Sequence, residues 1–139
     1  RKVKLYDVSY EIDGEKYRGL FSFALITNAN RVAGINNFYK DIKLDDNKFE
    51  ILLCNITKLK DIVKTLYFFA LYDASKIPGF YFYKADNIKI RFNSSLKKPL
   101  CIDGESFDDM SGNYNIKIDH DVYVLMPSKN INNLFCNKD

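Results

Sequence analysis

Apolar and polar residues alternate along much of the chain, which predicts short β-strands. The first strand is expected to end at Ile12. Its apolar residues stand at odd positions up to Leu5 and at even positions from Val8 onward, which predicts a bulge between them. Further segments with the same period of two are 49–53, 80–92, 114–118 and 122–126.

Asp13-Gly14 marks a turn between the first strand and a return strand. This dipeptide tolerates the positive φ angles of a type I′ turn, so a tight hairpin is expected. The return strand is expected to run without interruption from Tyr17 to Leu25. Because Leu20, Ala24 and Ile26 make its second face apolar too, burial of both faces is predicted toward its end.

One helix interrupts this pattern. It is expected to begin at the N-cap Thr57 and to end near Asp73, because its apolar residues recur at helical spacing. These residues are Leu59, Ile62, Val63, Leu66, Phe69 and Ala70. Before the helix, the asparagine-rich segment 27–39 has no periodicity and is typical of a long loop, which is often functional.

Together these elements predict a mainly β fold: an antiparallel β-sandwich with one α-helix packed across it. We expect residues 1–128 to form this single domain and the asparagine-rich residues 129–139 to form a flexible tail. The sequence starts at Arg1 without a methionine, so we expect it to be part of a longer protein.

Composition narrows the function classes. The net charge of +3 is spread along 139 residues, which argues against a nucleic-acid groove but leaves attraction to anionic headgroups open. Apolar runs fall far short of the roughly 20 residues of a membrane-spanning helix. The widely separated Cys54, Cys101 and Cys136 do not form a zinc motif and favour a reducing cytoplasm.

The strongest chemical candidate is Ile102-Asp103-Gly104-Glu105, in which two carboxylates flank a glycine at the end of a short apolar strand. Such a turn would expose both side chains, and a positioned carboxylate can act as a general base. However, Ile12-Asp13-Gly14-Glu15 is the same tetrapeptide and is predicted to be an ordinary hairpin. Taken alone, the motif therefore favours a simple turn.

The order of motifs adds to this picture. Five segments follow the asparagine-rich loop in sequence: Leu44 to Phe49, the helix, Tyr83 to Ile90, Pro99 to Glu105, and Val122 to Pro127. From about Gly14 to Pro127, this succession resembles the C-terminal domain of the bacterial diacylglycerol kinase and sphingosine kinase-like lipid kinases.

The resemblance implies a catalytic role for the second tetrapeptide. Glu105 would be the general base, with Asp103 beside it in the catalytic motif. ATP would be bound mainly by an N-terminal domain with a Gly-Gly-Asp-Gly-Thr loop, and its γ-phosphate would pass to a lipid hydroxyl. Because this chain has no such loop, we expect it to be inactive on its own.

The resemblance also implies a structural Mg²⁺ site on the turn before the central strand. Asp46 would supply a side-chain ligand, and Lys43 and Lys48 would supply backbone carbonyls, which suit this hard cation. Asn47 stands where the family usually has glycine, and the flanking lysines weaken cation binding. A solvated turn without a metal is the alternative.

The implied partners are a lipid with a hydroxyl head, the N-terminal nucleotide-binding domain and, peripherally, the membrane surface. The expected location is the cytoplasm, at the inner face of the membrane, without nucleic acid. The alternative function is a non-catalytic β-sandwich module that recognises a carbohydrate or a protein partner through the asparagine-rich loop. A structural domain without a site of its own also stays open, and the sequence does not identify the lipid.

Overall fold

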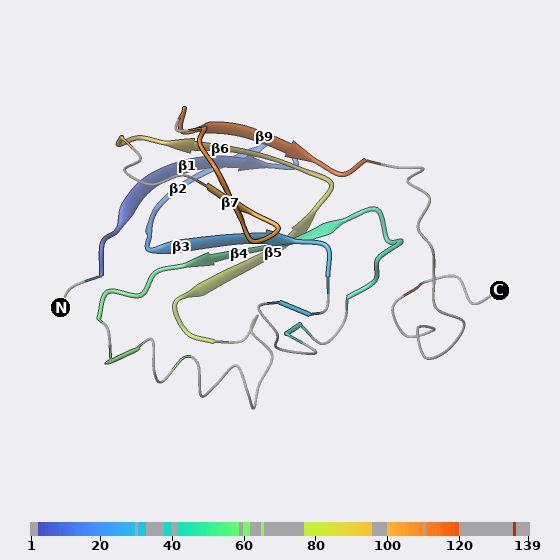
Figure 1. Cartoon of the computed structure of the whole chain (residues 1–139), viewed down its shortest axis with the longest axis horizontal. Helices are drawn as coiled ribbons and strands as arrows, with labels where there is room; N and C mark the ends of the chain where they lie inside the picture. Colours follow the sequence, from blue (N-terminus) through green and yellow to red (C-terminus); the bar gives the residue numbers. More distant parts are fainter. Residues whose placement is uncertain are drawn as a thin grey trace.

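The chain folds into stacked antiparallel sheets in a computed structural model (Figure 1). The structure describes residues 3–29, 31–32, 38–39, 42–58, 60–61, 65, 77–95, 100–109, 111–119 and 135. The strands are β1 (Tyr6–Ile12), β2 (Glu15–Phe21), β3 (Phe23–Thr27), β4 (Phe49–Cys54), β5 (Phe80–Ala85), β6 (Asn87–Phe92), β7 (Leu100–Ile102), β8 (Glu105–Phe107) and β9 (Asn113–Lys117).

The first sheet has the strand order β2-β1-β6-β9, and the second has the order β3-β4-β5. The predicted β-sandwich is confirmed, because inward residues of both sheets form one core between them. Its buried members are Val8, Tyr10, Ile12, Phe21, Phe49, Ile51, Leu53, Ala85, Ile88 and Ile90. The hairpin β7–β8 crosses in front of the two sheets in Figure 1.

The chain passes from one sheet to the other at single residues. Only Ser22 separates β2 from β3, and only Asp86 separates β5 from β6. The Ser22 hydroxyl donates to the carbonyl of Cys54 at 3.0 Å and accepts from the amide of Ile56 at 3.2 Å. The prediction of one uninterrupted return strand is therefore wrong, because these bonds stabilise a bend that redirects the chain into the second sheet.

Two other predictions about this hairpin are also wrong. β1 begins at Tyr6 and pairs with β2 residue by residue. The switch from odd to even apolar positions therefore falls before the strand and makes no bulge. Burial of both faces of the return strand does not hold either, since Leu20 is 51% exposed and Phe23 is 54% exposed. Both residues lie on edge strands, with side chains directed away from the central core.

A second apolar cluster covers the other face of β4. Leu52 packs there with Phe38, Tyr39 and Ile42. These residues come from the end of the asparagine-rich segment and from the stretch that follows it. As a result, every residue of β4 is buried, including the charged Glu50.

Other predictions fall on residues outside the described part of the chain. Of the predicted helix, Lys60, Asp61 and Thr65 are described and are helical, whereas Thr57 and Lys58 at its predicted start are described and are not helical; its apolar stripe is not described. The predicted strand at 122–126 is not described either, and of the predicted tail only Phe135 is. Within the described ranges, no helix is long and apolar enough to cross a membrane.

Candidate functional site

The second tetrapeptide forms the tip of the β7–β8 hairpin. Asp103 and Gly104 occupy its two turn positions with φ angles of 50° and 89°, as a type I′ turn requires. A Cβ added at Gly104 would meet nothing within 4 Å, so glycine is favoured at this position by the backbone conformation rather than by crowding. The predicted turn is confirmed.

The pairing register places Glu105 on an apolar face of this hairpin. Glu105 lies opposite Ile102, and Phe107 lies opposite Leu100. Cross-strand partners share a face, so these four side chains lie together. Ile102 is 50% exposed and Phe107 is 51% exposed. The Glu105 carboxylate is therefore solvent-accessible and is flanked by uncovered apolar side chains.

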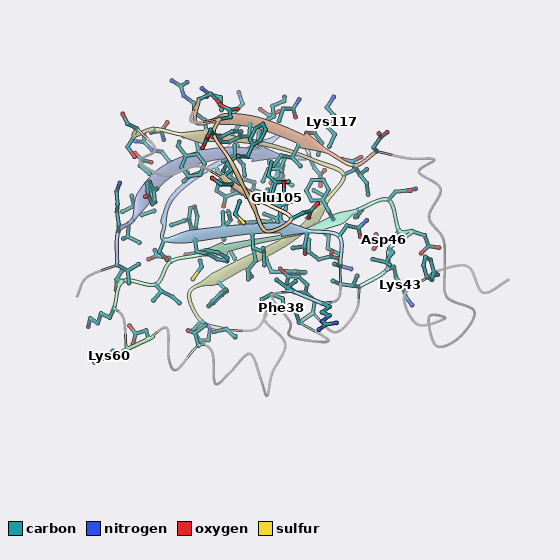
Figure 2. The ribbon with its side chains drawn as sticks, viewed as in Figure 1. Phe38, Lys43, Asp46, Lys60, Glu105 and Lys117 are labelled. Carbon is teal, nitrogen blue, oxygen red and sulfur yellow. The ribbon has the colours of Figure 1, made fainter. Side chains whose placement is uncertain are left out.

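The hairpin itself holds this carboxylate only loosely. Residues 101–108 are all exposed. No residue in the described ranges donates a hydrogen bond to Asp103 or Glu105 or pairs with either carboxylate. What remains is an accessible proton acceptor beside an apolar surface, on an exposed arm, the β7–β8 hairpin, which crosses in front of the sandwich in Figure 2.

The first tetrapeptide makes the same turn in different surroundings. Asp13 and Gly14 have φ angles of 52° and 82°. Ile12 is buried in the sandwich core, and the Glu15 carboxylate accepts a hydrogen bond from the Tyr17 hydroxyl. The sequence could not separate the two copies, but their packing does: both glutamates are exposed, while only the second copy also presents its isoleucine to solvent.

The turn before β4 takes the conformation that the sequence predicts. Asn47 has a φ of 58°, so an asparagine fills the position where glycine is usual. One carboxylate oxygen of Asp46, Oδ1, accepts a hydrogen bond from the amide of Lys48 at 3.1 Å. Such a side-chain bond to the backbone two residues later is typical of an Asx turn.

The other oxygen of Asp46 faces a lysine. Lys84 Nζ on β5 lies 3.6 Å from Asp46 Oδ2 and 3.4 Å from Glu50 Oε1. Glu50 is fully buried, and burial raises the pKa of its carboxyl above the usual range, an effect that the Lys84 ammonium partly offsets. Asp46, Glu50 and Lys84 thus form a partly buried charge cluster, which we call the Lys84 cluster.

The Lys84 cluster does not fit a divalent cation in its present arrangement. Both Asp46 oxygens already have partners, and an ammonium group holds the place of the positive charge. Within the described part of the chain, no three acidic, cysteine or histidine side chains converge to hold a metal ion. Mg²⁺ would have to displace Lys84, so metal binding by Asp46 with Lys43 and Lys48 stays a prediction.

The predicted catalytic and metal residues do not form one site. Figure 2 shows Glu105 on the hairpin, apart from Asp46 and Lys43 at the turn before β4. A cavity of about 740 Å³ belongs to neither group and lies on the first sheet. Glu50 and Lys84 were missed as candidates. Leu52 and Cys54, which make the second face of β4 apolar, were the available signal that Glu50 is covered.

Comparisons with known proteins support the resemblance. No family model matches. A curated diacylglycerol kinase of Staphylococcus saprophyticus is 26% identical over 93% of this chain and 42% of its own length. One of Staphylococcus carnosus is 27% identical over 89% of this chain and 40% of its own length. The chain thus spans less than half the length of these relatives.

Solved structures agree on the fold. Two chains described as a "putative diacylglycerol kinase" from Bacillus anthracis superpose with TM-scores of 0.59 and 0.58. The first is 22% identical and covers 76% of this chain and 34% of its own. The second is 20% identical and covers 70% of this chain and 33% of its own. The resemblance to the C-terminal domain of diacylglycerol kinase-like proteins is confirmed.

Proposed function

We propose that this chain is the lipid-side domain of an ATP-dependent, diacylglycerol kinase-like lipid kinase. In this proposal, the domain works in the cytoplasm, at the inner face of the membrane. The observation that carries the proposal is the accessible Glu105 carboxylate beside Ile102 and Phe107, in a chain whose curated relatives are named diacylglycerol kinases. The apolar face would receive the lipid tail next to the acidic group.

Glu105 would accept the proton of the lipid hydroxyl as that oxygen attacks the phosphoryl group. Asp103 would shape the turn and add a second carboxylate next to the reacting centre. The nucleotide-binding half would bring ATP and Mg²⁺, which supply the phosphoryl group and neutralise its charge. Since the exposed hairpin leaves Glu105 without a described partner, that half would also fix its position.

The two identical tetrapeptides provide a matched test. In the full-length protein, Glu105→Gln should lower phosphate transfer from ATP to diacylglycerol by about 10²- to 10⁴-fold, because the amide cannot accept the proton. Glu15→Gln, in the first copy, should leave the rate within about twofold of wild type. Radiolabelled transfer assays in mixed micelles measure both rates, and thermal melting checks that each variant is folded.

Equal activity of Glu105→Gln and wild type would remove the assigned base.

The isolated chain provides a second test, since we expect it to transfer no phosphate without the nucleotide-binding half. A binding module would instead give no transfer in the full-length protein either.

A further inference from the structure

The outward face of the first sheet, turned away from the core, carries a surplus of basic side chains. Because core residues such as Tyr10 and Ile90 point inward, their strand neighbours point outward. The outward cations on β2, β6 and β9 are Lys16, Arg18, Lys89, Arg91 and Lys117. Figure 2 shows Lys117 on the side of the molecule away from the second sheet. We call this surface the basic face.

The pairing register gathers these residues into rows across the sheet. Lys16 and Lys89 flank Glu11 in one row, and Arg18 and Arg91 flank Ser9 in the next. Asn115 and Asn113 on β9 complete the two rows. The rows line a trough of about 740 Å³, whose floor is formed by the strand residues between them. This cavity is therefore a basic trough.

Internal ion pairs neutralise only part of this charge. Lys89 Nζ lies 2.8 Å from Glu11 Oε1. Arg18 binds both oxygens of Asp7, at 2.9 and 2.5 Å. Among the residues that the structure describes, no carboxylate forms a close ion pair with Lys16 or Arg91, which lie on either side of β1, although Lys16 acts at longer range on Glu11, which Lys89 already pairs with. The trough thus keeps unneutralised positive charge and the side-chain amide of Asn115, whereas the amide of Asn113 already donates to the carbonyl of Ser111 at 3.3 Å.

The chemistry of the basic face favours phosphate groups at a lipid surface. Its outward strand positions carry no aromatic side chain, whereas single-stranded nucleic acids stack on aromatics and protein interfaces are enriched in them. Lysines, which protein interfaces avoid, are frequent here. Leu20, on the same face of edge strand β2 as Arg18, is 51% exposed and could enter the headgroup layer.

We propose that the basic face docks on an anionic bilayer, with Lys16 and Arg91 contacting headgroup phosphates. The inference rests on the proposed function, because it names the surface with which the enzyme meets the membrane that contains its substrate. Docking does not require Glu105, since Glu105 does not line the trough.

Vesicle sedimentation of the full-length protein tests this surface. Wild type should bind vesicles of equal parts phosphatidylglycerol and phosphatidylcholine and should not bind pure phosphatidylcholine. Lys16→Gln/Arg91→Gln should bind the anionic vesicles about 30-fold more weakly, since each cation near the surface contributes about five- to sixfold. Binding of wild type should weaken as sodium chloride is raised.

A matched control removes the same charge elsewhere. Lys58→Gln/Lys60→Gln changes two exposed lysines, and Figure 2 shows Lys60 at the opposite end of the molecule from Lys117. This variant should bind like wild type. Equal loss in both double variants, or no loss in Lys16→Gln/Arg91→Gln, would overturn the proposal. So would release by sodium phosphate at an ionic strength where sodium chloride has no effect, because that would indicate a discrete phosphate site.

The same assay separates this inference from the proposed function. Glu105→Gln should bind anionic vesicles like wild type while losing phosphate transfer. If Glu105→Gln keeps its activity but vesicle binding depends on Lys16 and Arg91, the catalytic assignment fails and the docking surface stands. If vesicle binding is absent although Glu105→Gln is inactive, the docking surface fails and the catalytic assignment stands.

Discussion

Lys84 supplies positive charge to two carboxylates at the start of β4. It lies within 3.6 Å of Asp46 and within 3.4 Å of Glu50, which has no access to solvent. A buried carboxylate is costly unless it is paired, so Lys84 is the residue that makes Glu50 tolerable in the second sheet. Alternation along β4 alone would place the Glu50 side chain in water, on the face of the strand that points away from Phe49 and Ile51.

Replacing Lys84 by methionine should therefore destabilise the protein. We expect a loss of about 2 kcal/mol in the free energy of unfolding, less than for a completely buried pair, because the Lys84 side chain is 31% exposed. Urea unfolding measures the change. Glu50→Gln/Lys84→Met, which removes both charges, should recover most of the loss, and an equally unstable double variant would contradict this account.

The same variant bears on the predicted metal site. With the ammonium removed, Mg²⁺ should bind Asp46 and Glu50 and raise the melting temperature of Lys84→Met. Wild type should melt at the same temperature with and without Mg²⁺. If Mg²⁺ stabilised wild type equally, the metal would bind without displacing Lys84.

Single residues show where sequence inference stops. The left-handed conformation of Asn47 was predictable, because asparagine is the residue after glycine that tolerates it best. The partner of Asp46 was not predictable, because Lys84 lies on another strand and no local pattern joins the two. The exposure of Glu105 was expected from its turn, but its apolar neighbours follow from the pairing of β7 with β8.

At the level of elements, the two Asp-Gly hairpins have the same turn and different support. The β1–β2 hairpin belongs to the first sheet and buries Ile12. The β7–β8 hairpin forms its own two-stranded sheet, and its residues from 101 onward are exposed up to 108. The β1–β2 hairpin contributes side chains to the core, whereas the β7–β8 hairpin mainly presents side chains to solvent.

This difference predicts unequal effects of equal substitutions. Gly14→Ala and Gly104→Ala both place a Cβ at a positive φ angle without a steric clash. Gly14→Ala should lower the free energy of unfolding by about 1–2 kcal/mol, because the strained turn belongs to the main sheet. Gly104→Ala should change it by less than about 0.5 kcal/mol but should reduce phosphate transfer in the full-length protein. Urea unfolding and transfer assays measure the two effects, and equal stability losses would contradict this view of the arm.

Most described strands were predictable, because period two survives wherever one face meets the core, as in Ile88 and Ile90. The break at Ser22 was not, because one serine within an apolar stretch is no recognised signal of a change of sheet. Its effect depends on hydrogen bonds to Cys54 and Ile56, which are distant in sequence.

For the whole molecule, two acidic groups should give opposite dependences of stability on pH. Hydrogen bonds from Arg18 and Asn93 lower the pKa of Asp7 to about 2. The folded state therefore binds this proton less tightly than the unfolded state, and stability should rise with pH from about 2 into the usual aspartate range. Burial raises the pKa of Glu50, so its contribution should fall as pH rises from the usual glutamate range to the raised folded value.

Two neutral variants separate these contributions. Asp7→Asn should lose the acid-side rise, and Glu50→Gln should lose the decline at higher pH. The free energy of unfolding in urea, measured across the pH range, shows both slopes. An unchanged decline in Glu50→Gln would mean that another group titrates there.

The bend at Ser22 has a mechanical consequence. One hydroxyl joins the corner between β2 and β3 to the end of β4, so sliding one layer over the other would break bonds to both Cys54 and Ile56. Sliding of the two sheets is thus opposed at the corner, while no described residue forms a comparable hydrogen bond to the side chains of the arm at 101–108. If this protein changes shape during a working cycle, we expect that arm to move while the two stacked sheets keep their relative position.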